Sequence, residues 1–268
     1  MSVCFPGEVF PQQNKKVSSK ARRVVALSSL SADLVMSINP DVLIGVPGTS
    51  LTNQDLRFAG LKRVSNGRSQ PSVELILGLD PDLVVGAEGF HYRVLASLDK
   101  LGVNTLSLKV DRWSSLEKSA RVLADNIAGS KSIIPSLEKL CPVQGASTPS
   151  GTSVLIIVGI SPKLSPGQQS WSGSLLDRLG LVSSTEGLPG SSQFSGYITM
   201  SNERLLAVDP DKVIVVNPSG DPDQLVESLL PFLPRLSRSD FKIMEYYGLI
   251  NPGSLSSIQK SCAALSAN

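Results

Sequence analysis

Apolar and polar positions along this chain follow the same pattern twice. Residues 72–86 read SVELILGLDPDLVVG, and residues 201–216 read SNERLLAVDPDKVIVV. Each copy starts with apolar residues at helical spacing, passes through Asp-Pro-Asp and ends in a β-branched run. A proline disfavours helix in the residue before it, and a short run of Val and Ile is typical of a strand buried on both faces. The sequence therefore predicts the same helix–strand unit in each half.

The rest of the pattern predicts an α/β fold with two similar lobes. Strands are expected at 23–29, 42–46, 82–86, 103–108 and 154–158, and helices at 31–39, 71–79, 91–101, 174–180, 222–230 and 254–265. Strands that alternate with helices indicate central, mostly parallel sheets flanked by helices. Residues 159–173 and 183–196 are expected to be long irregular segments.

One long amphipathic stretch separates the two lobes. Residues 114–140 carry apolar residues at helical spacing, and Gly129 and Pro135 are the positions where this helix would bend or break. The expected division is a leader (1–22), a first lobe (23–112), a connecting helix (113–141) and a second lobe (142–268). Two similar lobes imply a cleft between them, and ligands commonly bind in such clefts.

Composition argues against a nucleic-acid-binding protein and against a membrane-spanning segment. The 268 residues are 41% hydrophobic, 18% charged and 5% aromatic, with a net charge of +2. This balance is that of an ordinary globular chain and argues against a nucleic-acid-binding surface. No apolar run approaches the roughly 20 residues that span a bilayer.

The N-terminus is polar and lacks the apolar stretch of a signal peptide. If the native protein is exported, this chain is its mature or recombinant form. Cys4 is then either the lipidated first residue of the mature chain or a tail thiol of no consequence, since no lipidation motif precedes it.

Motifs of the common enzyme classes are missing from the sequence. No G-x-S-x-G elbow, no phosphate-binding G-x-x-x-x-G-K-[ST] loop and no G-x-G-x-x-G after a predicted strand is present. The one histidine, His91, excludes a multi-histidine zinc or manganese site and is either an axial haem ligand or a first-turn helix residue. We therefore expect a binding protein without a resident cofactor.

Loops at the carboxyl ends of the predicted strands hold the candidate ligand-binding residues, because ligands bind at that edge of an α/β sheet. They are Ser28, Ser29, Gly48, Arg68, Glu88, Gly89, Phe90, Lys109, Arg112 and Trp113 in the first lobe, and Ser161, Trp171, Phe194, Tyr197 and Asn217 in the second. The aromatic rings of the second lobe suit an apolar ligand surface, although each ring singly also fits ordinary loop packing.

The order of these segments resembles a known family. A strand leads through SLS into a helix, and GRSQPSVELILGLDPDLV, a long helix, GSLLDRLG and ERLLAVDPDKVIVV follow. Together they are similar to the substrate-binding proteins of bacterial ABC importers for iron-siderophores, haem and cobalamin, over about residues 22–265. The resemblance implies two α/β lobes joined by one rigid helix, with the ligand in a shallow cleft and little closure on binding.

Three charged residues gain a role from this resemblance. Family members present one glutamate per lobe to arginines of the membrane permease, and Glu74 and Glu203 match those positions. Both also fit exposed first-turn carboxylates that the helix dipole favours. Arg68 lies three residues before Pro71, where ferric-hydroxamate binding proteins place a ligand-contacting arginine, and a guanidinium suits the oxygens around iron. A surface arginine in a loop is the alternative.

The resemblance implies a monomer in the periplasm, or otherwise outside the cytoplasm, that captures a ferric-siderophore-type chelate. It would deliver this chelate to an ABC permease dimer through Glu74 and Glu203, while Arg68, Lys109 and Arg112 counter the ligand's negative charge. Cobalamin and haem are the alternative ligands, and a scaffold or regulatory protein that lost its ligand is the alternative class.

Two further cysteines, Cys141 and Cys262, lie near the ends of predicted helices. In an oxidising compartment the two can form a disulfide, and otherwise they are small buried apolar residues.

Overall fold

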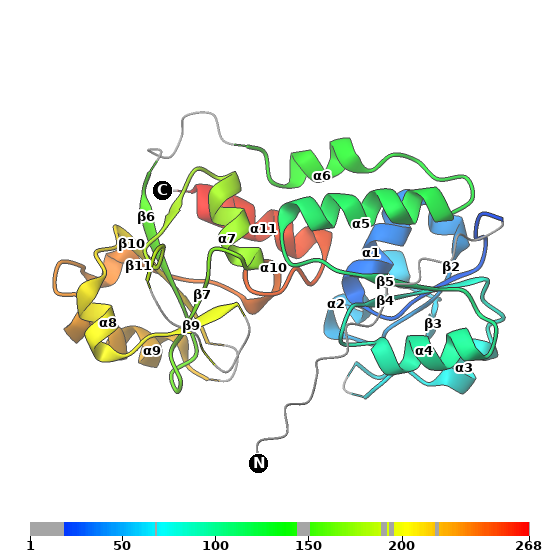
Figure 1. The fold of residues 1–268 in the computed structure, drawn as a ribbon, viewed down its shortest axis with the longest axis horizontal. Helices are drawn as coiled ribbons and strands as arrows, with labels where there is room; N and C mark the ends of the chain where they lie inside the picture. The colour runs from blue at the N-terminus through cyan, green and yellow to red at the C-terminus, as the bar shows by residue number, and fades with distance from the viewer. Residues whose placement is uncertain are drawn as a thin grey trace, which may run out of the picture.

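The computed structural model describes residues 19–67, 69–143, 151–188, 192, 196–217 and 220–267. Its strands form two sheets, one from each half of the chain (Figure 1). The first sheet, in the order β3-β2-β1-β4-β5, contains β1 (Val24–Ala26), β2 (Leu43–Val46), β3 (Lys62–Arg63), β4 (Leu83–Ala87) and β5 (Thr105–Leu108). The second, in the order β11-β10-β6-β7-β9, contains β6 (Ser153–Val158), β7 (Leu164–Pro166), β9 (Tyr197–Thr199), β10 (Lys212–Val216) and β11 (Phe241–Ile243), with β8 (Val182–Ser183) paired to β6.

Helices flank both sheets, which confirms the predicted α/β class. In the first half they are α1 (Ser29–Ile38), α2 (Ser50–Asn53), α3 (Val73–Leu77), α4 (Tyr92–Lys100), α5 (Trp113–Asn126) and α6 (Ile134–Leu140). In the second half they are α7 (Trp171–Arg178), α8 (Asn202–Ala207), α9 (Pro222–Leu229), α10 (Tyr246–Leu249) and α11 (Leu255–Ser266). The short 3-10 helices among the described residues are η1 (Pro40–Val42), η2 (Leu56–Phe58), η3 (Leu230–Phe232) and η4 (Arg238–Asp240). Within the described ranges, no helix has the length and apolar character needed to cross a membrane.

The two sheets differ in strand direction. Strand pairs of the first sheet are parallel, whereas β7 and β9 of the second sheet run antiparallel to their neighbours. Residues 159–173 were predicted to be irregular, but β7 lies among them. This strand has three residues and ends in a proline, so no run of alternating apolar positions marks it in the sequence.

Alternate residues of each strand enter different hydrophobic cores. In β1, Val24 and Ala26 pack in one core while Val25 packs in another. In β6, Ile156 belongs to the same core as Val24, while Ile157 belongs to a third. Because successive side chains point to opposite faces, each sheet has an inner and an outer face. One continuous core covers both inner faces and includes residues of α1, α5, α6, α7, α10 and α11.

The stretch predicted as one connecting helix is two helices. α5 ends at Asn126, and Ile127 pairs with Ala21 in an isolated bridge. Gly129 then has a φ of 61°, a left-handed conformation that glycine adopts without strain. A single helix over 113–141 was therefore a wrong prediction, and the break falls near one of the two positions at which the sequence allowed it. The shared inner core packs the two halves together.

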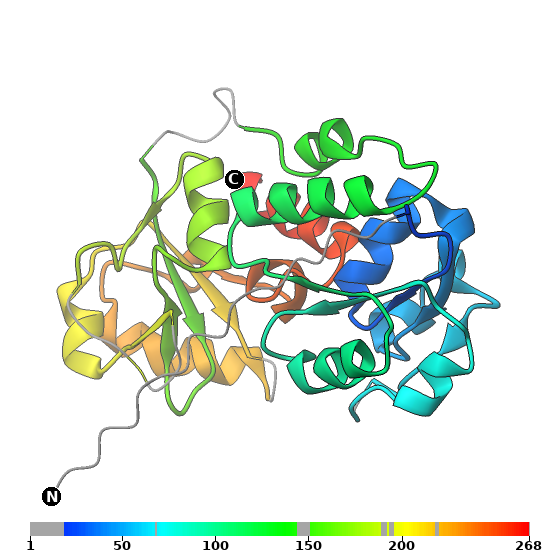
Figure 2. The same ribbon diagram turned by 45° about the vertical axis from the view of Figure 1, so that its right-hand side comes forward.

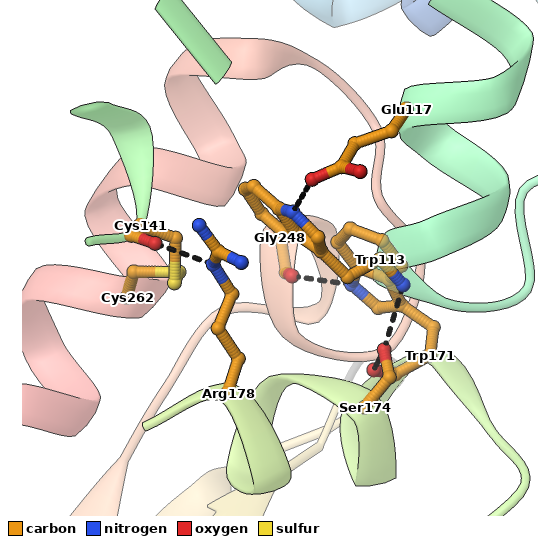
Figure 3. The surroundings of a disulfide bond; sticks show 8 residues. All are labelled: Trp113, Glu117, Cys141, Trp171, Ser174, Arg178, Gly248 and Cys262. Carbon is orange, nitrogen blue, oxygen red and sulfur yellow. Dashed lines mark hydrogen bonds between the residues drawn. A yellow bond between two sulfur atoms is a disulfide. The ribbon is translucent and has the colours of Figure 1, made fainter. Parts of the chain in front are cut away.

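The C-terminal helix lies against the first half of the chain. α11 packs on α1 and α6, and a disulfide joins Cys141 at the end of α6 to Cys262 of α11, with Cα atoms 5.3 Å apart (Figure 3). Arg178 of α7 donates from Nε to the carbonyl oxygen of Cys141 at 2.5 Å. Its guanidinium also lies 4.0 Å over the ring of Trp113 in α5. Four helices are thus linked at one place.

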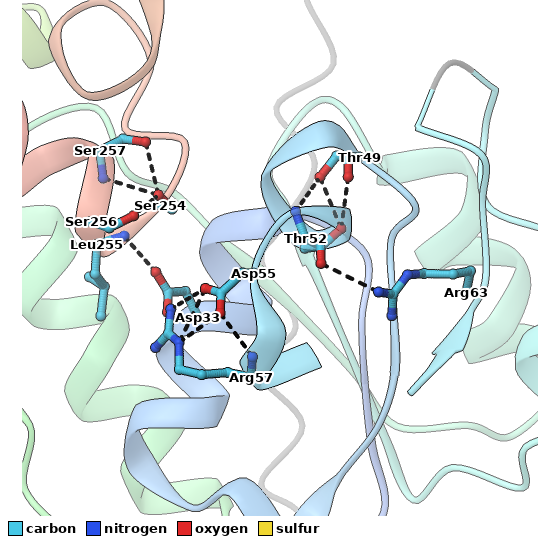
Figure 4. A network of polar contacts seen from close by, with 10 residues as sticks. All are labelled: Asp33, Thr49, Thr52, Asp55, Arg57, Arg63, Ser254, Leu255, Ser256 and Ser257. Atoms are coloured by element: carbon cyan, nitrogen blue, oxygen red, sulfur yellow. Dashed lines mark hydrogen bonds and ion pairs between the residues drawn. The ribbon is translucent and has the colours of Figure 1, made fainter. Parts of the chain in front are cut away.

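A buried carboxylate of α1 holds the start of α11 and also pairs with an arginine of η2 (Figure 4). The Asp33 carboxylate is buried, and its Oδ2 accepts a hydrogen bond from the backbone N–H of Leu255 at 2.7 Å. Its Oδ1 lies 2.7 Å from Nη2 of Arg57, which also binds Asp55. Burial raises the pKa of Asp33, and the charge of Arg57 opposes this rise. The contact ties the second half of the chain to the first.

The helix–strand unit predicted twice is present twice. Ser72 and Ser201 cap α3 and α8, each accepting a hydrogen bond from the backbone N–H three residues later. Four residues after each capping serine, Ile76 and Leu205 are fully buried in the outer cores. Both helices lead through Asp-Pro-Asp into the strands β4 and β10, so the prediction is confirmed in both halves.

The last aspartate of each Asp-Pro-Asp ties its unit to a neighbouring strand. The carboxylate of Asp82 accepts hydrogen bonds from the backbone N–H groups of Arg22 and Arg23, directly before β1. The carboxylate of Asp211 accepts one from the N–H of Ser153, where β6 begins. The last aspartate of the repeated sequence therefore binds the backbone at the start of the central strand of each sheet.

Candidate ligand-binding site

Parallel strands bring most first-half candidates to one edge of the sheet. β2, β1, β4 and β5 are consecutive parallel neighbours, so the residues that follow them share the carboxyl edge. These residues are Ser28 and Ser29 after β1, Gly48 after β2, Glu88, Gly89 and Phe90 after β4, and Lys109, Arg112 and Trp113 after β5.

The loops after β1 and β2 are held together by hydroxyl groups. Ser28 caps α1 by accepting a hydrogen bond from the backbone N–H of Ser31 at 3.1 Å. The hydroxyls of Ser29 and Thr49 lie 2.7 Å apart and join the two loops. A Cβ at Gly48 would stand 2.3 Å from the carbonyl oxygen of Ser65, so only glycine fits there. Local packing alone therefore accounts for Gly48.

The loop after β4 presents an aromatic ring at the surface. Phe90 is 70% exposed and stands edge-on to the imidazole of His91, with ring centroids 4.9 Å apart. His91 itself is buried, and its Nδ1 accepts a hydrogen bond from the N–H of Ala87 at 3.0 Å. Burial lowers the pKa of His91 to about 4, so the ring is neutral at physiological pH. The histidine supports the loop from below rather than facing a ligand.

Two cations follow β5. The ammonium of Lys109 lies 3.1 Å from the carboxylate of Asp111. Burial opposes ionisation of Asp111, but hydrogen bonds from Lys109 and Ser115 outweigh it and hold the pKa of Asp111 below its usual value. Arg112 donates from Nη2 to Oε1 of Gln169 at 2.6 Å. Because Gln169 belongs to the second half, Arg112 bridges the two halves beside the candidate loops.

The two tryptophans form the junction between the halves. Trp113 and Trp171 are buried and stacked, with ring centroids 6.3 Å apart (Figure 3). Nε1 of Trp113 donates to Glu117 at 2.7 Å, and Nε1 of Trp171 donates to the carbonyl of Gly248 at 2.8 Å. Trp171 was predicted to lie in a loop, but it is the first residue of α7. Both rings are occupied by packing and do not line an open surface.

The second-half candidates are spread over separate elements. Ser161 is exposed between β6 and β7, and Asn217 after β10 donates to the carbonyl of Asp221 at 2.9 Å. Tyr197 starts β9 and packs against the inner core. Burial, with a smaller contribution from Tyr246, raises the pKa of Tyr197 to about 12. Ser161 and Asn217 follow the parallel neighbours β6 and β10 and therefore lie at one carboxyl edge, whereas Tyr197 is at the start of β9.

Three predicted residues lie outside the described ranges. They are Cys4, Arg68 and Phe194. Their proposed roles in lipid attachment and ligand contact stay predictions.

Sequence analysis missed two tyrosines at the second-half edge. Tyr246 and Tyr247 follow β11, the parallel neighbour of β10, and therefore lie at the same carboxyl edge as Asn217. Their rings meet edge to face with centroids 5.5 Å apart, and Tyr247 is exposed. Burial raises the pKa of Tyr246. The signal in the sequence was the apolar-polar-apolar FKI run before the aromatic pair, which is too short to identify alone.

The predicted docking glutamates occupy equivalent exposed positions. Glu74 and Glu203 are each the second residue of their helix, α3 and α8. A hydrogen bond from Ser201 holds the pKa of Glu203 below its usual value. Figure 1 shows α3 and α8 at the outer ends of the two halves, on the same lower side, and Figure 2 keeps both on that side. The two helices that carry the glutamates therefore lie on one side of the molecule.

A cavity of about 440 Å³ lies at a different place, between α1, α6 and α11. Arg57, Asp55, Leu137 and Leu255 are among the residues that line it. None of the residues predicted to bind a ligand lines this cavity. It stands beside the ion pair of Asp33 with Arg57.

A family model described as periplasmic binding protein matches residues 24–231. No curated protein sequence matches the chain. Solved structures share its fold. The periplasmic catecholate-siderophore binding protein VctP from Vibrio cholerae superposes with a TM-score of 0.72 at 15% identity, covering 93% of this chain and 94% of its own. A periplasmic haem binding protein from Pseudomonas aeruginosa gives 0.61 at 23% identity, with 92% of each chain covered.

A third solved structure extends the range of ligands among these similar folds. The periplasmic vitamin B12 binding protein BtuF of Vibrio cholerae has a TM-score of 0.64 at 17% identity, covering 91% of this chain and 96% of its own. At such identities the likeness concerns the fold alone. Three proteins named for three different ligands thus share one architecture with this chain.

Proposed function

Because the chain belongs to the periplasmic binding protein family, whose model spans residues 24–231, we propose that it captures a ferric-siderophore-type chelate and delivers it to an ABC importer. Membership makes it a non-enzymatic, extracytoplasmic component of an ABC transporter that binds a small ligand and meets a membrane permease. The ligand class and the residues that contact it are the content of the proposal.

The observation that carries the ligand class is the grouping of cations and an exposed ring after β4 and β5. Lys109 and Arg112 follow β5, and the exposed ring of Phe90 follows β4 at the same edge. The chelating oxygens of a siderophore are electron-rich, and ammonium and guanidinium groups hydrogen-bond to such oxygens. An aromatic ring suits the apolar body of the chelator. Arg68 would add a third cation in the same half.

Haem and cobalamin are the alternative ligands of the same site. The observation that favours a macrocycle is the pair of exposed rings, Phe90 after β4 and Tyr247 after β11. Each ring follows a strand of a different sheet, and an exposed ring suits the apolar face of a macrocycle. A scaffold that has lost its ligand is the remaining alternative.

Isothermal titration with a panel of ligands tests the proposal. The panel contains ferric catecholate, ferric hydroxamate, ferric citrate, haemin and cyanocobalamin. We expect saturable, sub-micromolar binding of one ferric chelate, weakened about tenfold or more by Arg112→Ala, which removes a charge-assisted hydrogen bond. Arg121→Ala is the matched control, since Arg121 is an exposed arginine of α5 that pairs with Glu117. Binding of haemin or cobalamin instead would identify the alternative, and no binding would favour the scaffold.

Docking is proposed to use Glu74 and Glu203. Their support is equivalent placement in α3 and α8 and the position of these two helices on one side of the molecule. We expect Glu74→Gln with Glu203→Gln to abolish permease-dependent uptake while ligand affinity stays unchanged. Glu138→Gln with Glu227→Gln is the control, because these are exposed glutamates of α6 and α9. Unchanged uptake in the first pair would contradict the docking role.

A further inference from the structure

The two helix–strand units share a leucine that the fold leaves at the surface. Leu77 of α3 is 39% exposed, and Leu206 of α8 is 61% exposed. Each stands three residues after a docking glutamate and directly after a fully buried residue, Ile76 or Leu205. The buried neighbour fixes the helix to its outer core, and the leucine projects away from that core.

Most other residues shared by the two units have a purpose inside the molecule. The shared serines cap the helices, the prolines end them, and the aspartates Asp82 and Asp211 bind the start of a neighbouring strand. Single exposed leucines are ordinary on protein surfaces. Apart from the glutamate, the other exposed helix residues of the two units differ, so the same exposed leucine at the equivalent position calls for a contact outside the molecule.

The helix geometry places each leucine beside its glutamate. Residues three apart on a helix are neighbours on its surface, so Glu74 adjoins Leu77 and Glu203 adjoins Leu206. The next residues, Gly78 and Ala207, are small and exposed, which lets a partner surface approach closely. Each helix therefore carries one exposed carboxylate beside one exposed leucine, and α3 and α8 lie on the same side of the molecule (Figures 1 and 2).

We propose that Leu77 and Leu206 are apolar anchors of the surface that docks on the ABC permease. The inference rests on the proposed docking role of Glu74 and Glu203. Each glutamate–leucine pair would meet a basic side chain beside an apolar depression, and the permease would present this arrangement twice. The carboxylates steer the encounter and fix its register, while burial of the leucines slows dissociation.

The glutamate contacts and the leucine contacts should respond differently to ionic strength. Exposed charge pairs are screened as ionic strength rises, whereas burial of apolar surface is not weakened by screening. Docking through glutamates alone would fall steeply with salt. Docking with leucine anchors keeps a salt-resistant part, which the leucine substitutions remove and the glutamate substitutions spare.

The test measures binding to the permease of the importer, reconstituted in nanodiscs with its ATPase subunits, by biolayer interferometry at low and high salt. We expect Leu77→Ser with Leu206→Ser to weaken binding about 100-fold, about tenfold per leucine, mainly through faster dissociation. Leu77→Met with Leu206→Met should retain it. Leu56→Ser with Val182→Ser is the control, because these are exposed apolar residues of η2 and β8.

Ligand titration of every variant separates this inference from the proposed function. If the serine pair binds the permease like the unchanged protein while Glu74→Gln with Glu203→Gln does not, the leucine anchors are wrong and the docking role stands. If neither pair changes permease binding, the docking surface lies elsewhere. Loss of ligand binding in the serine pair would point to disturbed folding, and the exposed single variant Leu206→Gln then decides, with an unchanged affinity for the permease overturning the inference.

Discussion

The outer helix–strand units of the two halves are nearly interchangeable, whereas the loops at the carboxyl ends of their strands are not. Both units have a serine cap, a buried apolar residue and a strand-binding aspartate at equivalent positions. In contrast, the loop after β4 rests on a buried histidine and exposes Phe90, while the loop after β10 is closed by Asn217. Each helix–strand unit is constrained because its aspartate binds the start of a neighbouring strand. The loops at the carboxyl ends of the strands lack this constraint and can differ between the halves.

A second contrast lies between the outer and inner layers. Each sheet has its own outer core, but the inner faces share one core to which the C-terminal helix contributes. Two similar halves are therefore not two independent folding units. The halves should therefore behave alike in their outer units and unfold together through their shared inner core.

The largest effect is expected from the disulfide in the inner layer. Its two cysteines are separated by 121 residues, and cross-links that close loops of this length stabilise by about 4–5 kcal/mol in the chain-entropy model. Cys141→Ser with Cys262→Ser should lower the free energy of unfolding by about this amount in denaturant titrations. Hydrogen exchange should show equal loss of protection in β4 and β10. Cys4→Ser is the control, and a loss confined to one sheet would mean that the halves unfold separately.

Lowering the pH should destabilise the loop after β4 and not the loop after β10. Burial holds the pKa of His91 at about 4, below the ordinary 6.5, so its stabilisation is complete above pH 6.5 and is lost as the pH falls from 6.5 to 4. The loss should be about 3 kcal/mol, since each pKa unit corresponds to about 1.4 kcal/mol. His91→Asn, whose Oδ1 can accept the hydrogen bond from Ala87, should not show this loss.

Urea titrations between pH 7 and pH 4 measure this difference between the two proteins. Equal slopes of stability against pH would show that His91 does not carry the effect. Local exchange should also rise at residues 87–91 and not at 217–221, because the loop after β10 contains no histidine.

The sequence predicted the features that depend on short-range pattern. The repeated units were visible because a proline ends each helix and a β-branched run follows it, and both effects act within a few residues. Most strands and helices of the α/β fold were identified for the same reason. The pairing of Cys141 with Cys262 was left open, since it depends on which helices pack together.

The features that sequence analysis missed depend on distant contacts. The apolar stripe continues past Asn126, so the sequence offered Gly129 as a possible break but did not decide it, and the bridge between Ala21 and Ile127 ends α5 in the structure. Trp171 resembles a loop aromatic until the junction with Trp113 is known. Tyr246 and Tyr247 gain their position from β11, a strand of three residues that exists through its pairing with β10.

The smallest expected effect is a difference in unfolding free energy between matching variants of the two helix–strand units. Asp82 accepts two backbone hydrogen bonds, from Arg22 and Arg23, whereas Asp211 accepts one, from Ser153. Asp82→Ala should therefore cost about 2 kcal/mol of unfolding free energy and Asp211→Ala about 1 kcal/mol, since exposed hydrogen bonds each contribute on the order of 1 kcal/mol. Chemical denaturation of both variants checks the order. Equal losses would mean that one of the bonds to Asp82 contributes nothing, and a larger loss at Asp211 would mean that β6 depends on its unit more than β1 does.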